Sequence, residues 1–295
     1  MNNVFALAML CSLLVRSALL AADNPLPSVD AAQLTAFMAK WQSYQAFNFP
    51  TDEADGPLLL AALARNPAGP WSAYLTMQFA GIRYDLCDLP ESERRQVAAK
   101  HVATLRSADQ ILAAAVQRGG TNAAELALEQ SRIQLTLGPM LVEAGPAYLP
   151  EVSALAHQMI AHLPATNDCG YGDVVFAANA LLGRVALREG NLAAARTYLQ
   201  AAGRVPVSPV LGSFGPDYVF PAELLRHGTP ADRTAVLGFL EDIAHFWQEP
   251  PLNDNSKHVD ADHLQQLETW KVAIRAGKIP DDPGWRCPRA SASLR

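Results

Sequence analysis

Residues 173–203 read DVVFAANALLGRVALREGNLAAARTYLQAAG, and this stretch decides the fold. Apolar residues recur every three to four positions on both sides of the short segment REGN at 188–191, which is the pattern of two amphipathic helices. Gly190 lies where the first helix must reverse, because glycine adopts the left-handed conformation without steric cost. The stretch therefore predicts a helical hairpin, with Gly183 and Ala195 as the small residues at which its two helices cross closely.

The spacing within this hairpin resembles that of a tetratricopeptide repeat, a unit of about 34 residues. The matching positions are Leu182, Gly183, Gly190, Ala195, Leu199 and Ala202. Asn179 and Ala186 depart from it, because the repeat has aromatic residues there. One repeat cannot bury its own apolar face, so Leu182 and Leu199 are expected to fill the seam between neighbouring hairpins. An ordinary helical hairpin is the alternative.

Helical periodicity extends over nearly the whole chain, with proline or glycine at the joints. The other expected helices cover residues 34–44, 58–65, 71–84, 90–118, 121–138 and 151–162. Thr121 or Asn122 is expected to cap the helix over 121–138, with Glu125 in position for a capping interaction, and Gly138 and Pro139 to end it. No window alternates with β-branched residues, so no sheet is expected. The predicted fold class is all-α, with antiparallel helical hairpins stacked as a tetratricopeptide-like α-solenoid or packed as a compact helical array.

The segment after the hairpin, residues 205–221, contains X-Pro steps, among them Ser208-Pro209 and Gly215-Pro216, and two glycines that are expected to prevent a helix. The expected organisation of the whole chain has four parts. They are a signal peptide (1–22), an N-terminal helical region (23–170), a tetratricopeptide-like helical region (171–280) and a C-terminal tail (281–295).

Part of the chain resembles a group of uncharacterised bacterial tetratricopeptide-repeat-like proteins. The similar segments are LLGRVALREGNLAAARTYLQAAGR at 181–204, SPVLGSFGPDYVFPAELLRHG at 208–228 and VLGFLEDIAHFW at 236–247. With weaker similarity up to residue 280, they span roughly the C-terminal 40% of the chain. The resemblance implies a tetratricopeptide-like fold without an assigned biochemical role. Ser213 and Phe214 match its loop closely, whereas residues 217–219 depart from it, so no shared ligand is implied.

Residues 4–22 are apolar except for Ser12, Arg16 and Ser17, and they end in two alanines before a proline-containing linker. This pattern predicts a cleaved secretory signal, a secreted or periplasmic location and no membrane span after the signal is removed. An uncleaved anchor and a buried first helix are the alternatives. The remaining cysteines, Cys87, Cys169 and Cys287, lack CxxC spacing, and either one disulfide or three separate thiols is possible.

The charges and histidines limit the possible chemistry. With 23 basic and 29 acidic residues the net charge is −6, so nucleic acid is not expected as a partner. The densest cluster of metal-ligand types contains His258, Asp260, Asp262 and His263. Asp260 is also typical of a helix N-cap, and this interpretation is preferred. Without a recognisable motif, neither catalytic residues nor a cofactor is expected.

These observations favour a non-enzymatic binding or scaffold protein that engages another protein, a peptide or a small ligand in the cell envelope. The candidate binding residues are Asn179, Arg184 and Arg188 on the first helix of the hairpin, and Ser213 and Phe214 in the following loop. Trp71, Tyr74 and Trp285 are candidate groove aromatics, although the spacing of the first two favours the core. One alternative is an all-α metal-dependent hydrolase centred on Asp260 and His263. Another is a self-associating structural protein.

Overall fold

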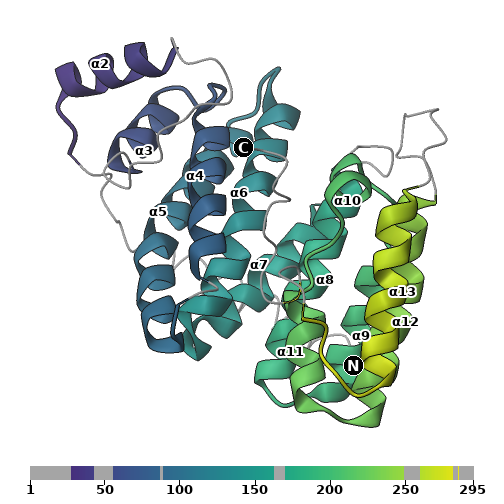
Figure 1. Ribbon diagram of the computed structural model, residues 1–295. Coiled ribbons are helices and arrows are strands. Elements are labelled where there is room, and N and C mark those ends of the chain that lie inside the picture. Colours follow the sequence, from purple (N-terminus) through teal and green to yellow (C-terminus); the bar gives the residue numbers. More distant parts are fainter. Residues whose placement is uncertain are drawn as a thin grey trace, which may run out of the picture.

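The computed structural model describes residues 28–42, 56–86, 89–162, 170–248, 260–281 and 285. Over these residues the chain forms α-helices α2 to α13 and two short 3-10 helices, η2 and η3, and it contains no β-strand (Figure 1). The all-α prediction is therefore confirmed for the described part of the chain.

The first group of helices surrounds the long antiparallel pair α5 and α6. Its members are α2 (Ala31–Gln42), α3 (Gly56–Arg65), α4 (Trp71–Leu86), α5 (Glu91–Gln117), α6 (Ala123–Ala144), η2 (Pro146–Tyr148) and α7 (Leu149–Ala161). Fully buried side chains such as Leu105, Leu112 and Ile133 form what we call the first hydrophobic cluster. As predicted, α5 stops just before two glycines, Gly119 and Gly120, which both have positive φ.

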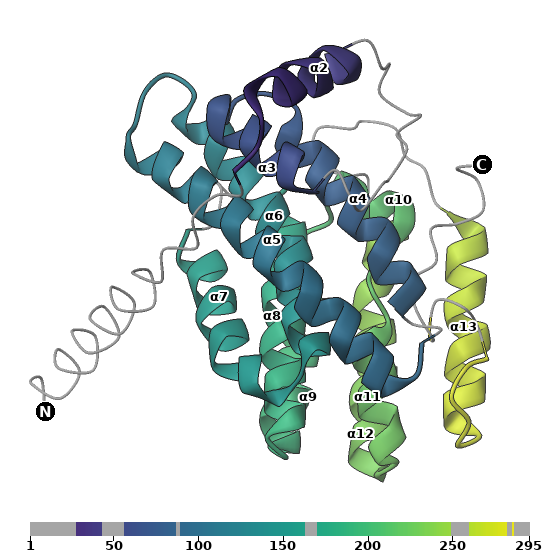
Figure 2. The same ribbon diagram turned by 90° about the vertical axis from the view of Figure 1, so that its left-hand side faces the viewer.

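The second group follows in chain order. Its members are α8 (Tyr171–Arg188), α9 (Leu192–Gly203), α10 (Pro209–Phe214), α11 (Val219–His227), α12 (Pro230–Asp242), η3 (Ile243–Trp247) and α13 (Ala261–Arg275). Phe239, Phe246 and Trp247 lie at the centre of the second hydrophobic cluster. Figure 2 shows α8 and α9, α11 and α12, and α13 as a row of upright columns beside the tilted α5.

Helix α8, the first helix of the second group, lies next to the first group and contributes to both clusters (Figure 1). Leu181 and Val185 belong to the first cluster, whereas Phe176 and Leu187 belong to the second. Since opposite faces of one helix are buried against different neighbours, α8 is apolar nearly all round. The position of α8 therefore fixes how the two groups meet.

The predicted hairpin is present as α8 and α9. Gly190 has a φ of 78°, and the side chain of Asn191 caps α9 by accepting a hydrogen bond from the backbone N–H of Ala194 (3.1 Å). Leu182 and Leu199 are both buried, in the first and second cluster respectively.

The reason predicted for Gly183 is wrong. A Cβ at Gly183 would overlap the ring of Phe220, which comes from α11 and not from α9. Its small size therefore permits a contact between α8 and α11 that the repeat pattern did not predict.

The predicted C-terminal boundary of the helix over 121–138 is also wrong. Helix α6 continues through Pro139 to Ala144, although proline removes one hydrogen bond from the helix. Gly138 lies so close to Leu181 of α8 that a Cβ would overlap that side chain, and the buried face of α6 continues through Met140 and Leu141. Tertiary packing thus outweighs the local preference of proline. Asn122 does occupy the N-cap position of α6, but its side chain makes no capping bond.

The loop predicted over 205–221 contains α10 and the beginning of α11. Pro209 takes the first helical position of α10, where the missing N–H is not needed, and Ser208 caps the helix by accepting from the backbone N–H of Leu211 (3.0 Å). Gly215, with a φ of 73°, then ends α10. Pro209 and Gly215 therefore bound a short helix instead of preventing one.

Several sequence predictions concern residues outside the described ones. They include the signal segment over 1–22 and the three cysteines Cys87, Cys169 and Cys287. Among the helices of the described ranges, none has the combination of length and hydropathy that crossing a bilayer requires.

Candidate functional site

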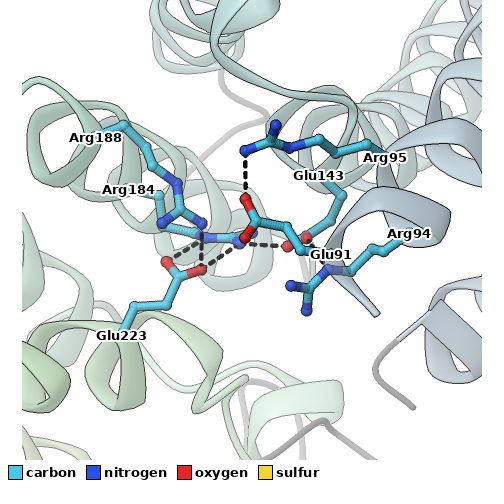
Figure 3. Close-up of polar contacts among 7 residues, drawn as sticks. All are labelled: Glu91, Arg94, Arg95, Glu143, Arg184, Arg188 and Glu223. Carbon is cyan, nitrogen blue, oxygen red and sulfur yellow. Dashed lines mark hydrogen bonds and ion pairs between the residues drawn. The ribbon is translucent and has the colours of Figure 1, made fainter. Parts of the chain in front are cut away.

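Arg184 forms the centre of the most extensive polar site between the helices of the structure. Its Nε donates to Oε2 of Glu223 (2.9 Å) and its Nη2 to Oε1 of the same carboxylate (2.7 Å), which is a bidentate ion pair. Nη2 also donates to Oε1 of Glu143 (2.5 Å). One guanidinium of α8 thereby joins α11 on one side and α6 on the other (Figure 3).

Two further arginines extend this arrangement toward the surface. Nε of Arg94, from α5, lies 3.2 Å from Oε2 of Glu143, and Nη2 of Arg188, from α8, donates to Oε1 of Glu223 at 2.8 Å. The resulting order Arg94, Glu143, Arg184, Glu223, Arg188 alternates in charge, and we call these five residues the arginine ladder. Both ends of the ladder are guanidiniums.

Local sequence explains how α11 reaches α8. Because Gly183 lacks a Cβ, the ring of Phe220 packs directly on the backbone of α8. Glu223 follows Phe220 by three residues and therefore lies on the same face of α11, opposite Arg184. Arg184 and Arg188 are four residues apart on one face of α8, so a single carboxylate contacts both.

Burial and charge together determine the ionisation of the ladder. The side chains of Arg184 and Glu223 are only 5% and 9% exposed. Burial on its own raises the pKa of Glu223. The charge and hydrogen bonds of Arg184, together with the charges of Arg188 and Arg226, act in the opposite direction and hold that pKa below the ordinary value of 4.5. For Arg184 burial likewise opposes the charge, and the two carboxylates more than compensate, so its pKa is raised. Both groups are therefore charged at neutral pH.

The exposed end of the ladder has unused hydrogen-bond donors. The side chain of Arg188 is 43% exposed, and within the described part of the chain its guanidinium uses one of its five N–H donors, in the bond to Glu223. Arg226 is exposed and also acts on the charge of Glu223.

The ladder has three guanidiniums and two carboxylates, so the local charge is positive in a chain whose net charge is −6. Beside the ladder, Glu91 and Arg95 form an exposed pair that adds no net charge (Figure 3).

The five predicted binding residues do not gather in one place. Arg184 and Arg188 meet on Glu223, but Arg184 is buried and its role is to hold the ladder, so it cannot contact a partner directly. Asn179 is half-buried and donates its side-chain N–H to the backbone carbonyl of Val175 within its own helix (2.8 Å).

Ser213 and Phe214 are exposed on α10, which lies at the opposite end of α8. Ser208, the N-cap residue of α10, donates a hydrogen bond from its hydroxyl to Asp173 in the first turn of α8. Asp173 lies about 22 Å along the helix from Arg188. Ser213 and Phe214 therefore form a surface separate from the ladder.

The cluster before α13 has a structural role. Oδ1 of Asp260 accepts from the backbone N–H groups of Asp262 and His263, both at 3.1 Å, and Oδ2 lies 2.8 Å from Nδ1 of His263. Burial raises the pKa of Asp260, but these bonds have the larger effect and lower it below its ordinary value. The N-cap interpretation is confirmed, while His258 lies outside the described residues. No group of three or more His, Cys, Asp or Glu side chains suited to a metal ion occurs within the described ranges.

Of the aromatic residues considered for a groove, Trp71 and Trp285 are core residues, and Tyr74 is half-buried against the first cluster. Trp71 and Trp285 are 2% and 1% exposed, and Trp285 stacks on Tyr218 with ring centroids 5.4 Å apart. Trp285 lies within the expected tail over 281–295, so this part of the segment belongs to the second cluster.

Sequence reasoning missed Glu143 and Glu223, and it favoured a solvated role for Arg94, which pairs with Glu143. One signal was present for Glu223, which is the only acidic residue within the otherwise apolar start of VFPAELLRH. No protein-family model, curated protein or solved structure matches the chain. The chemistry of the ladder is therefore the basis for a functional proposal.

Proposed function

We propose that the protein is a non-enzymatic binding or scaffold protein of tetratricopeptide-like type, which engages another polypeptide or a small ligand in the cell envelope. The observation that carries the proposal is the exposed guanidinium of Arg188, held in place by a buried carboxylate and left with unused donors. Support for the repeat-like architecture comes from the presence of the α8–α9 hairpin, and from the resemblance of the C-terminal part to tetratricopeptide-repeat-like proteins. Support for the location comes from the signal-like segment over 1–22.

Stability alone gives no reason for a buried ion network at this junction. Removing charges from water is costly. A protein in which well-packed apolar residues replace a buried ion pair is often as stable as the original protein or more stable. The ladder does, however, fix the side chain of Arg188 before any partner arrives. A side chain that is already ordered loses less entropy on binding, which favours a role in recognition.

Arg188→Ala tests this function, and Arg204→Ala is the matched control. Arg204 is also an exposed arginine of the second group, paired with Asp242 at 2.9 Å, but it lies outside the ladder. The wild-type protein and both variants are used as baits in an extract of the cell envelope, and a retained partner is then purified and titrated against each by calorimetry. We expect the partner to bind wild-type and Arg204→Ala proteins equally and Arg188→Ala about tenfold more weakly. Equal binding to all three, or no retained partner, would refute the proposal.

A further inference from the structure

We propose that the surface around Arg188 and Arg226 binds carboxylates of an acidic segment in a partner protein. This inference rests on the binding function proposed above and assigns it a ligand chemistry. Both arginines act on Glu223, Arg188 through a hydrogen bond and Arg226 through its charge, and Arg226 lies on the same face of α11 as Glu223 because it follows that residue by three positions.

The charge of Glu223 is already used. Arg184 binds it through two hydrogen bonds, and Arg188 adds a third. Within the described part of the chain, Arg226 has no ion-pair partner of its own. Both oxygens of Glu223 therefore already accept hydrogen bonds from Arg184, and the positive charge of the two exposed guanidiniums attracts an anion.

The order of the ladder indicates which anion fits. Guanidinium and carboxylate alternate from Arg94 to Arg188, so the group that continues the series beyond Arg188 is another carboxylate. A carboxylate accepts two parallel N–H bonds from one guanidinium, as Glu223 does from Arg184. With Arg226 as a second cation, the surface favours a segment that has more than one Asp or Glu side chain over a single compact anion.

The charge of the whole protein decides how such binding depends on salt. A net charge of −6 gives an acidic ligand no attraction at long range, so the affinity depends on direct contacts with the two arginines. Exposed charges are screened over about 10 Å at 0.1 M salt. Added salt screens both the attraction by the two arginines and the repulsion by the net negative charge, so we expect binding to weaken only gradually as salt is added.

The test uses the full chain and a fluorescein-labelled hexaglutamate peptide, followed by fluorescence anisotropy at low salt. Hexaglutamine and hexalysine peptides are the peptide controls, and Arg204→Ala is the control variant. We expect hexaglutamate alone to bind, and Arg188→Ala and Arg226→Ala each to weaken it about tenfold. Arg188→Lys, which keeps the charge but loses the planar fork, is expected to bind more weakly than wild type. Because both arginines are exposed, these variants are expected to melt like the wild-type protein in circular dichroism.

Competition distinguishes the sources of the anion. If glutarate and inorganic phosphate displace the peptide only weakly, the surface recognises an acidic segment, as proposed. Strong displacement by phosphate would overturn the proposal in favour of a phosphate site. Failure of hexaglutamate to bind, or binding by both arginine variants as tight as that by the wild-type protein, would also overturn it. If a purified partner still depended on Arg188 in that case, the binding function would stand and only its ligand chemistry would fail.

Discussion

Glu223→Gln is the substitution that tests the ladder most directly. The carboxylate of Glu223 accepts three hydrogen bonds, two from Arg184 at 2.7 and 2.9 Å and one from Arg188 at 2.8 Å. Glutamine keeps the size of the side chain but removes its charge. It also replaces one accepting oxygen with an NH₂ group that donates, so at least one donor of Arg184 loses its acceptor.

The size of the effect follows from burial. Removing one partner of a buried ion pair costs about 3–5 kcal/mol, because the other charge is left without compensation. Arg184 keeps its bond to Glu143, so we expect a loss at the lower end of this range, about 3 kcal/mol in the free energy of unfolding at pH 7. With an m-value of about 3 kcal/mol/M, the urea midpoint then falls by about 1 M.

The effect has a defined pH dependence. Because the pKa of Glu223 is lowered in the folded protein, its stabilising contribution is fully present above the unfolded value of about 4.5 and is lost as the pH falls through the lower folded value. The difference between wild-type and variant proteins is therefore expected to persist from pH 7 down to about 4.5 and to shrink below it.

Urea unfolding followed by circular dichroism at several pH values measures this difference. Glu189→Gln is the control, since Glu189 is an exposed residue directly after α8. We expect it to change the midpoint by less than about 0.2 M, in line with other surface substitutions. If Glu223→Gln unfolded at the same urea concentration as the wild type, the ladder would not be a stabilising network and the reasoning from burial would be wrong.

Three other substitutions test separate features of the fold. Gly183→Ala is expected to lower the melting temperature, with a loss of about 1–3 kcal/mol, because its Cβ would overlap the ring of Phe220; an unchanged melt would show that α8 and α11 are less closely packed. Trp285→Ala is expected to cost about 3–5 kcal/mol, since the indole is 1% exposed, and a urea midpoint equal to that of the wild type would contradict its place in the second cluster. Burial raises the pKa of Asp173 to about 6, despite the opposing hydrogen bond from Ser208, so the ionised carboxylate destabilises the folded protein. Asp173→Asn is therefore expected to be more stable than wild type by up to about 3 kcal/mol above pH 6, and this gain should disappear as the pH falls to about 3.8; a gain independent of pH would refute that cause.

Much of the helical structure was predictable, because periodicity and capping are local. The expected helix over 90–118 differs from α5 by one residue at each end, since a proline precedes it and two glycines follow it. The boundary at Pro139 failed because the contact of Gly138 with Leu181 comes from a distant part of the chain. Local preferences therefore predicted where helices begin and end only when tertiary packing did not oppose them.

The candidate site was less predictable for the same reason. Arg184 and Arg188 were identified on the correct helix, but their surroundings depend on residues far away in sequence. Glu223 is 39 positions from Arg184, and Glu143 is 41 positions from it. No spacing rule links such positions, so the sequence indicated a charged helix face without showing that half of it is buried.

The buried guanidinium explains why the exposed ones are available. If Glu223 had only Arg188 as a partner, the two charges would cancel and the surface would be neutral. Arg184 instead occupies both oxygens of Glu223 and also bonds to Glu143, so its one buried charge acts on both carboxylates before an exposed arginine contributes. The three guanidiniums and two carboxylates of the ladder leave a net charge of +1, which is shared by Arg94 and Arg188 at its two ends. A residue that cannot contact a partner thus determines the charge of the surface that can.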